Sequence, residues 1–318
     1  MAETIALGRS EVRVPRLGLG VMTWGRAAGL QRLNPARSMY GGPDPADEQA
    51  AFEASLGAGV HFFDTAAFYS GGASERRLGE LAEGRSVVIA TKFPARPFAR
   101  LADFGPTLEA SLRRLRRQSV DLYQHHFPVP WIDIPALMAA MAGAVRAGQI
   151  RAVGVSNYGA AQLRTAHAAL AEHGIALASN QVEYSLLHRR PEVDGVLDAC
   201  RELGVALIAY QPLASGALTG RYLDGARPTG LRRFSGRFSR SGLEPLRPVV
   251  EELRTIGAGY GKSPAQVALR WLIQTEGVIP IPGAKNADQA SHNAAALSFA
   301  LEPAETDRLD QLTRRWRR

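Results

Sequence analysis

The chain has 318 residues, of which 46% are hydrophobic and 21% are charged, and it carries a formal net charge of +8. This composition is typical of a globular protein with a large core, and it excludes disordered, collagen-like and fibrous proteins. The single cysteine, Cys200, excludes an intramolecular disulfide framework and any metal site built from several cysteines. We therefore expect a reducing, cytoplasmic environment and predict no metal centre.

Eight short apolar runs predict β-strands along the chain. They span residues 17–21, 60–63, 87–91, 120–124, 152–155, 176–179, 205–209 and 278–281. After each run comes an amphipathic segment, rich in alanine and leucine, that predicts a helix. These helices span residues 47–56, 74–82, 103–117, 134–147, 160–172, 191–203, 264–274 and 286–296.

Eight strand–helix units with no low-complexity linker favour an α/β fold, a (β/α)8 TIM barrel formed by a single domain over residues 1–318. An open doubly wound sheet usually has fewer units and a glycine fingerprint after its first strand, and residues 17–22 lack that fingerprint.

Other segments fall outside the repeat. A pair of short N-terminal strands around residues 8–10 is expected to plug the barrel floor, and further helices are expected near 243–257 and from Ala304. Residues 26–44 are long for the loop after a barrel strand. Such loops lie on the catalytic face, so this segment is either a pocket wall or a surface insertion.

The basic residues form short clusters at 113–117, 221–240 and 314–318. They do not alternate with aromatic residues along a stripe, which favours solvated faces over a nucleic-acid surface. No apolar run approaches the roughly 18 residues of a membrane span, and the N-terminal segment lacks the features of a secretory signal. We expect neither a nucleic acid nor a membrane as a partner.

Polar side chains stand at three successive strand ends, where a barrel of this kind carries its chemistry. Asp64 and then Tyr69 follow the second strand, Lys92 follows the third, and His126 follows the fourth. We expect these four side chains to converge. His125 precedes His126, and the alternation of side chains along a strand directs one of the two into the barrel and the other toward the helices.

This set of side chains suits proton transfer to a carbonyl oxygen. The ammonium of Lys92 is expected to lower the pKa of Tyr69 by favouring the phenolate, which would make the phenol a usable acid near neutral pH. Asp64 is expected to pair with Lys92 and keep it charged. His126 is expected to bind the carbonyl oxygen by a hydrogen bond, for which a neutral imidazole suffices.

Seven motifs in chain order are similar to those of the aldo-keto reductases, and the resemblance spans nearly the whole chain. The first is Phe63-Asp64-Thr65-Ala66 with Tyr69 and Gly72-Ala73-Ser74-Glu75. The others are Ala90-Thr91-Lys92 and the segments 121–126, 154–158, 180–184, 209–213 and 279–283.

The resemblance implies a reductase that uses NADPH to reduce an aldehyde or ketone, with Asp64, Tyr69, Lys92 and His126 as the catalytic tetrad and Tyr69 as the proton donor. NADH is the less expected cofactor. A small-molecule carbonyl compound would be the partner. An alternative, in the manner of the related potassium-channel β subunits, is a module that binds NADPH and senses its redox state with little turnover.

The cofactor residues carry over by position in the same motifs. Ser156, Asn157 and Gln181 would hold the nicotinamide amide, Tyr210 would stack on the ring, and the loop after Tyr210 would bind the pyrophosphate. Lys285 would bind the 2′-phosphate and Arg232 or Arg233 would add a second charge, although Gln289 stands where many NADPH-selective members have arginine. The full expected set is Val21, Met22, Ser156, Asn157, Gln181, Tyr210, Gln211, Leu213, Gly216, Leu218, Arg232, Gly283, Lys285, Gln289 and Asn293.

The substrate pocket is expected to have an aromatic lining. Trp24, Phe93, Phe127 and Trp131 follow strand ends and are its predicted walls. Such a lining accepts many aldehydes, and the sequence predicts neither the natural substrate nor the oligomeric state.

Overall fold

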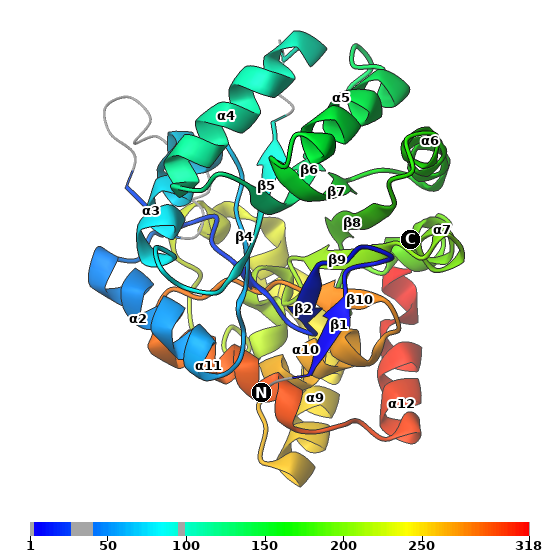
Figure 1. The fold of residues 1–318 in the computed structure, drawn as a ribbon. Helices are drawn as coiled ribbons and strands as arrows, with labels where there is room; N and C mark the ends of the chain where they lie inside the picture. Colours follow the sequence, from blue (N-terminus) through cyan, green and yellow to red (C-terminus); the bar gives the residue numbers. More distant parts are fainter. Residues whose placement is uncertain (1–2, 27–40, 95–98, 318) are drawn as a thin grey trace.

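Eight parallel strands form one sheet in the computed structural model, which describes residues 3–26, 41–94 and 99–317 (Figure 1). Their order in the sheet follows their order in the chain. The strands are β3 (Leu19–Gly20), β4 (Phe62–Asp64), β5 (Val88–Phe93), β6 (Val120–His125), β7 (Ile150–Ser156), β8 (Leu177–Glu183), β9 (Ala206–Tyr210) and β10 (Val278–Pro280). Each corresponds to one of the predicted apolar runs.

The first and last strands of this sheet meet and close it into a barrel. Gly20 bridges Gly283 in parallel fashion, and the N–H of Gly18 donates to the carbonyl of Pro280 at 3.0 Å. Gly18 must lack a side chain because a Cβ there would lie 2.6 Å from the ring of Phe62. The predicted (β/α)8 fold is confirmed.

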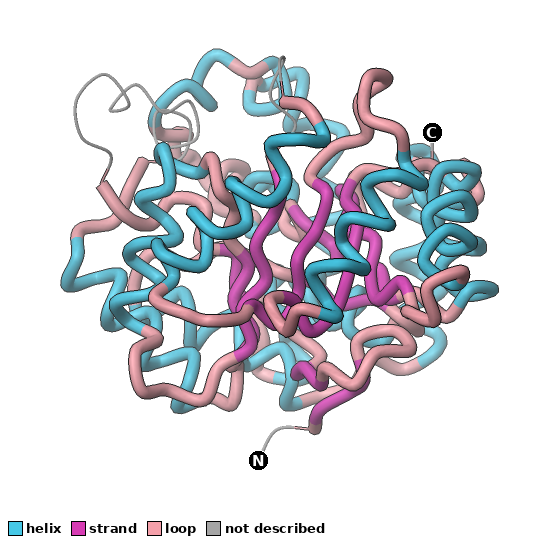
Figure 2. Tube along the Cα trace, turned by 45° about the horizontal axis from the view of Figure 1, so that its top comes forward, coloured by secondary structure: helices cyan, strands magenta, loops and turns pink. Residues whose placement is uncertain are grey.

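Helices surround the barrel in all views (Figures 1 and 2). The helices after the eight strands are α2 (Pro45–Gly57), α3 (Ala73–Leu81), α4 (Phe104–Leu115), α5 (Ile134–Arg146), α6 (Ala160–Ala171), α7 (Val196–Leu203), α10 (Pro264–Gln274) and α11 (Ala287–Ala294). The additional helices are α8 (Arg240–Leu243), α9 (Arg247–Tyr260) and α12 (Pro303–Thr313). Within the described ranges, the chain has no helix with the length and apolar character needed to cross a membrane.

One helix begins later than its sequence predicts. The predicted span 191–203 contains a short 3-10 turn, Arg190–Glu192, followed by α7 from Val196. Gly195 separates them with a left-handed φ of 80°, a conformation that a helix interior does not accept. The proline at 191 therefore starts a turn of its own rather than the main helix.

The N-terminal hairpin closes the lower end of the barrel, as predicted. Its strands are β1 (Thr4–Ala6) and β2 (Arg13–Pro15), which pair in antiparallel fashion, and they lie below the parallel strands in Figure 2. Leu7, Val12 and Val14 pack with residues that point into the barrel, such as Phe62 and Leu122. The lower half of the barrel is thus a filled apolar core.

Alternation along each strand separates this interior from the layer beneath the helices. On β5, Ala90 packs in the interior cluster, whereas Ile89 and Phe93 pack in the cluster between strands and helices. Lys92 therefore shares the inward face with Ala90. Residues 27–40 of the predicted loop 26–44 lie outside the described residues.

Candidate active site

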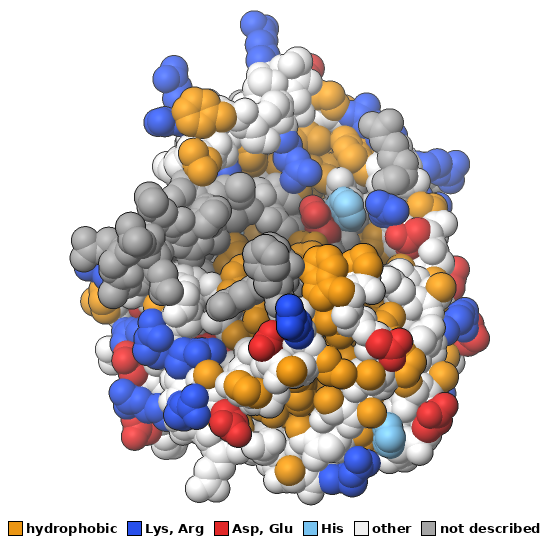
Figure 3. All heavy atoms as spheres, turned by 90° about the horizontal axis from the view of Figure 1, so that it is seen from above, with side chains coloured by type: hydrophobic (Ala, Val, Ile, Leu, Met, Phe, Trp, Pro, Cys, Tyr) orange, Lys and Arg blue, Asp and Glu red, His pale blue; other side chains and the backbone are white. Residues whose placement is uncertain are grey.

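The four predicted tetrad residues meet at the carboxyl ends of β4, β5 and β6. Lys92 is fully buried, and its Nζ donates to Oδ1 of Asp64 at 2.5 Å and to the carbonyl of Thr65 at 2.7 Å. Figure 3 looks onto this end of the barrel from above and shows a hollow near the centre of the face with hydrophobic side chains gathered around it.

Tyr69 lies in a 3-10 turn, Tyr69–Gly72, and its ring is enclosed by two other members of the set. The Nζ of Lys92 lies 5.3 Å from the centre of the Tyr69 ring. The ring of His126 meets that of Tyr69 edge-on, with centroids 5.7 Å apart and planes at 81°. A phenol, an ammonium and an imidazole therefore share one buried site beside the carboxylate of Asp64.

The predicted effect of Lys92 on Tyr69 is wrong for this structure. Burial raises the pKa of Tyr69 well above its usual value, and the charges of Asp64 and Tyr210 raise it further. Burial also lowers the pKa of Lys92, although the charge and hydrogen bond of Asp64 oppose that shift. Removal from water therefore outweighs the attraction between Lys92 and a phenolate, and Tyr69 is a protonated phenol throughout the neutral range.

The two histidines at the end of β6 face opposite sides. His125 points toward the helices, where its Nδ1 lies 2.7 Å from the hydroxyl of Tyr158 and its ring packs against Phe93. His126 points into the site beside Tyr69. Burial, followed by the charge of Lys92, holds the pKa of His126 well below its usual value, so its imidazole is neutral.

Three of the predicted nicotinamide-binding residues form one hydrogen-bonded group. The amide of Asn157 donates to the carbonyl of His126 at 3.0 Å and accepts from the hydroxyl of Tyr210 at 3.0 Å. Ser156 donates to the carbonyl of Gln181 at 2.8 Å, and the amide of Gln181 donates to Asp64 at 2.8 Å. The ends of β7, β8 and β9 are thereby bonded to the ends of β4 and β6.

The predicted pyrophosphate loop is a tight turn with four left-handed residues. Gln211, Ala214, Ser215 and Gly216 have φ values of 55°, 49°, 59° and 91°. Ser215 donates to the side chain of Gln211 at 2.7 Å. Leu213 is half-buried and Leu218 is fully buried in the apolar core, so any contact of Leu218 with a cofactor would have to use its backbone.

Three cations gather next to this loop. Arg232 is buried, donates to the carbonyl of Ser215 at 2.9 Å and donates to the hydroxyl of Tyr222 at 3.1 Å. Arg221 donates to the same hydroxyl at 2.5 Å. Burial, with the charges of Arg232 and then Arg221, lowers the pKa of Lys285. Mutually repelling cations around one place create a site for an anion.

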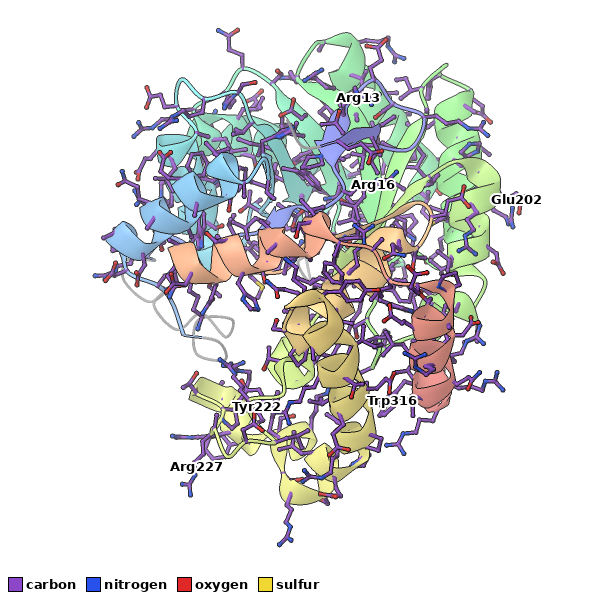
Figure 4. All side chains as sticks on the ribbon, turned by 90° about the horizontal axis from the view of Figure 1, so that it is seen from below. Arg13, Arg16, Glu202, Tyr222, Arg227 and Trp316 are labelled. Atoms are coloured by element: carbon purple, nitrogen blue, oxygen red, sulfur yellow. The ribbon has the colours of Figure 1, made fainter. Side chains whose placement is uncertain are left out.

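The segment that carries Tyr222 lies apart from the hairpin end of the molecule. Figure 4 shows Tyr222 and Arg227 near each other, in a different part of the molecule from Arg13 and Arg16. The cationic cluster around Tyr222 therefore lies away from the N-terminal hairpin.

The remaining expected cofactor residues differ in their exposure and in their hydrogen-bond partners. Gly283 is exposed, Gln289 accepts from the N–H of Lys285 at 3.0 Å, and Asn293 donates to the carbonyl of Gly283 at 3.3 Å. Met22 is half-buried. Val21 is fully buried, with its N–H bonded to Asp64 and its carbonyl accepting from Ser74. Val21 thus has no group left for a cofactor.

Two of the four predicted pocket walls do not face the site. Phe93 is fully buried between β5 and α4, edge-on to Phe104. Trp24 is fully buried against Phe63, and its indole donates to the carbonyl of Ala284 at 2.9 Å. Both belong to the core beneath the helices because their positions point away from the barrel interior.

The other two predicted walls are exposed, and one of them, Phe127, lies beside the tetrad. Phe127 is 42% exposed and stacks on His126 with centroids 4.9 Å apart, and Trp131 is 54% exposed. Phe68, which the sequence reading missed, is 41% exposed and lies 4.9 Å from His126. Its position directly before Tyr69 was the available signal.

Sequence reading also missed two polar partners inside the site. Gln124 is fully buried and donates to Asp64 at 3.2 Å, and the backbone carbonyl of Thr65 holds Lys92. Gln124 could have been found, because it shares the inward face of β6 with Leu122 and is a polar residue in an apolar run.

Comparisons with known proteins identify a family and relatives that this chain resembles. The family model for the aldo/keto reductase family matches residues 16–314. An uncharacterized oxidoreductase of Mycobacterium tuberculosis is 41% identical over 262 residues, which cover 81% of this chain and 79% of that protein. The chloroplastic pyridoxal reductase of Arabidopsis thaliana is 35% identical over 316 residues, which cover 93% of this chain and 82% of that protein.

Solved structures share the same architecture. A glycerol dehydrogenase from Gluconobacter oxydans superposes with a TM-score of 0.82 at 26% identity, over 98% of this chain and 95% of that one. A thermostable aldo-keto reductase in complex with the inhibitor epalrestat gives a TM-score of 0.76 at 29% identity, over 98% and 99% of the two chains. The relatives named as oxidoreductases support the same role here.

Proposed function

Because this chain belongs to the aldo/keto reductase family, we propose that it is an oxidoreductase that transfers a hydride from NADPH to an aldehyde or ketone, with Tyr69 as the proton donor. The observation that carries this proposal is the convergence of Tyr69, Lys92 and His126 beside Asp64. These groups can hold a carbonyl oxygen and supply it with a proton.

The residues at the upper end of the barrel fit NADPH. A phosphate suits the cluster of Arg221, Arg232 and Lys285, because the pKa of Lys285 is lowered by burial and then by the charges of the two arginines, and an anion relieves that repulsion. The half-exposed ring of Tyr210 is fixed through its hydroxyl and offers a flat face for stacking. NADH lacks the 2′-phosphate and would use fewer of these cations.

Each member of the tetrad has a distinct task. When bound, NADPH supplies the hydride. Tyr69 holds its proton because burial raises its pKa, so it donates that proton only as negative charge develops on the substrate oxygen. Lys92 lies beside the ring and stabilises the resulting phenolate, while Asp64 holds Lys92 in place. His126, as a neutral imidazole, donates a hydrogen bond to the same oxygen.

The exposed aromatic side chains favour flat, apolar carbonyl compounds. Phe68 and Phe127 both pack against the ring of His126, and Trp131, nearby in the chain, is more exposed than either of them. Aromatic rings bury well against such surfaces. Aromatic aldehydes, with pyridoxal among them because of the Arabidopsis relative, are therefore the first substrates to test.

We also propose a cytoplasmic location, and neither a nucleic acid nor a membrane as a partner. The single, buried Cys200 accords with a reducing compartment. A small-molecule substrate agrees with the family.

The decisive experiment follows NADPH oxidation by the purified protein with an aromatic aldehyde, with Tyr69→Phe beside the wild type. The substitution should leave the Kd for NADPH unchanged and lower kcat by about a hundred- to ten-thousandfold. Tyr260→Phe is the matched control, because it removes a hydroxyl that donates to Glu305 away from the tetrad. Unchanged turnover in Tyr69→Phe would remove Tyr69 from the mechanism.

The same experiment tests the alternative function. A protein that binds NADPH tightly and turns over no carbonyl compound would be a redox-sensing module.

A further inference from the structure

We infer that Arg114 is a positioning residue for Tyr69, because its side chain, held by Glu75, fixes the left-handed turn that carries the phenol. This inference rests on the proposed function of Tyr69 as proton donor. Arg114 lies on α4, outside the strand ends that supply the tetrad, and touches none of the four tetrad side chains among the contacts that the structure describes.

The turn after Tyr69 has an unusual backbone. Ser70, Gly71 and Gly72 are consecutive left-handed residues, with φ values of 51°, 62° and 82°. Such a conformation is disfavoured for a residue with a side chain, and Ser70 is one. It persists only where the surroundings hold it, so the neighbours of this turn determine where the Tyr69 ring lies.

The side chain of Arg114 lies directly against the turn. A Cβ added to Gly72 would meet Cδ of Arg114 at 2.6 Å and its Nε at 2.8 Å. Glycine at 72 therefore does two things at once, since it accepts the left-handed φ and makes room for the arginine. The three heavy atoms nearest to that position all belong to Arg114.

Glu75 fixes the guanidinium in this place. The Nε of Arg114 donates to Oε2 of Glu75 at 2.6 Å, and an Nη donates to Ser111 at 3.2 Å. Glu75 is fully buried in the first turn of α3, which starts where the left-handed turn ends. A buried carboxylate requires a charged partner, so the pair holds together strongly.

The pair of Arg114 and Glu75 is called the brace below. The other oxygen of Glu75 connects this brace to the strand that carries Lys92. Oε1 accepts from the hydroxyl of Thr91 at 2.6 Å, and Thr91 directly precedes Lys92 on β5. The chain of contacts from Arg114 to Glu75 to Thr91 therefore ties together the backbone segments of Tyr69 and Lys92. The cofactor-binding residues on β7, β8 and β9 are not part of it.

This placement predicts a specific defect. Proton donation requires the phenol within hydrogen-bond reach of the substrate oxygen, and a displacement of about 1 Å can cost about a hundredfold in rate. Loosening the brace should therefore slow proton transfer without weakening NADPH binding.

The test uses Arg114→Lys, which keeps the charge beside Glu75 but replaces the planar guanidinium. A second variant, Glu75→Gln combined with Arg114→Gln, leaves no unpaired buried charge and guards against failure to fold. For each, we would measure kcat, the Kd for NADPH, the solvent deuterium isotope effect on kcat, and hydrogen–deuterium exchange of the peptide covering residues 68–75.

A matched control is available on α3, the helix that carries Glu75. Arg77 on α3 pairs with Glu48 at 2.8 Å, with side-chain exposures of 18% and 1%, close to the 22% and 0% of Arg114 and Glu75. Its partner Glu48 lies on α2, whereas Glu75 lies at the start of α3, next to the Tyr69 turn. Arg77→Lys is therefore the counterpart of Arg114→Lys, because it keeps a charge beside a buried carboxylate and replaces the planar guanidinium at another ion pair of the same burial.

We expect both brace variants to lower kcat by about ten- to a hundredfold, to raise the solvent isotope effect and to speed exchange in peptide 68–75, with Kd within twofold of wild type. Arg77→Lys should change none of these. Wild-type kcat and exchange in both brace variants, or equal defects in Arg77→Lys, would overturn the inference. Absence of turnover in the wild type would instead contradict the proposed function, and peptide exchange would still decide the role of Arg114.

Discussion

The side-chain amide of Gln181 on β8 donates a 2.8 Å hydrogen bond to Oδ2 of Asp64 on β4. This bond crosses the barrel and joins a residue expected to bind the nicotinamide to the carboxylate that holds Lys92. Gln124 donates to the same oxygen at 3.2 Å. Cofactor binding and the alignment of the proton donor therefore share one carboxylate.

Two glutamine variants should separate these tasks. Gln181→Leu should weaken NADPH binding by about tenfold and also lower kcat, because it removes a cofactor contact together with a donor to buried Asp64. Gln124→Leu removes a donor to the same oxygen and should lower kcat with the Kd for NADPH unchanged. Calorimetric titration with NADPH and steady-state kinetics check both, and an unchanged Kd in Gln181→Leu would exclude it from the cofactor site.

The raised pKa of Tyr69 should give carbonyl reduction and alcohol oxidation different pH dependences. The phenol remains protonated at neutral and mildly alkaline pH, so the kcat for reduction should stay flat from about pH 6 to pH 9. The reverse reaction needs the phenolate, whose fraction rises about tenfold per pH unit below the pKa, so alcohol oxidation should accelerate as pH increases. A reduction rate that declines with a midpoint near pH 8 would show that Lys92 outweighs burial after all.

Cofactor choice should depend on Lys285. Lys285→Ala should weaken NADPH by about tenfold or more and NADH by less than about twofold, because a charge-assisted hydrogen bond is worth roughly 1.5–3 kcal/mol. Lys262→Ala is the matched control, since Lys262 is a lysine whose Nζ contacts Ser298 at 2.8 Å. Equal losses for the two cofactors would show that Lys285 does not bind the 2′-phosphate.

Acid should destabilise the protein through its buried histidines. Burial lowers the pKa of His125 to about 4 and holds that of His126 well below its usual value. The unfolded chain takes up these protons near pH 6.5, whereas the folded chain does not, so stability is present above about pH 6.5 and is lost as pH falls toward 4. The free energy of unfolding should fall by about 1.4 kcal/mol per pH unit for His125.

Urea unfolding between pH 7 and pH 4.5 measures this slope. His125→Gln keeps a side chain that can bond to Tyr158 and cannot titrate, so its slope should be shallower than that of the wild type. His173→Gln, which replaces an exposed histidine, controls for the substitution itself. The same slope in all three proteins would mean that carboxylates alone set the acid sensitivity.

Much of the fold could be read from the sequence because strand and helix periods differ. The eight apolar runs each became a strand, and the polar residues that followed them met at one end of the barrel. The span of α7 was less predictable, because Pro191 is a good helix start and only the left-handed Gly195 moves the helix onward.

The site was harder to predict where burial decides the outcome. The motif spacing placed Lys92 beside Tyr69. Whether the pKa of the phenol is raised or lowered depends on how completely water is removed, and that is a property of the packed structure. Phe93 was assigned to the pocket for its position after Lys92, although alternation along β5 directs it to the helices. The role of Arg114 could not be predicted from the sequence, because its contact with Gly72 joins the end of α4 to the start of α3, and these residues are far apart in the chain.

The closure between Gly20 and Gly283 makes the barrel depend on both ends of the chain. During synthesis on the ribosome, residues 18–24 are made first, and their partners at 280–284 follow only some 260 residues later. Trp24 and Ala284, which are joined by a hydrogen bond, have this separation in the chain. Until then β3 and the growing edge of the sheet expose unpaired N–H and carbonyl groups, which are templates for pairing with other chains. Chains that stop short of β10 should therefore accumulate as aggregates instead of partly active enzyme, and chaperone demand should be greatest just before β10 is synthesised.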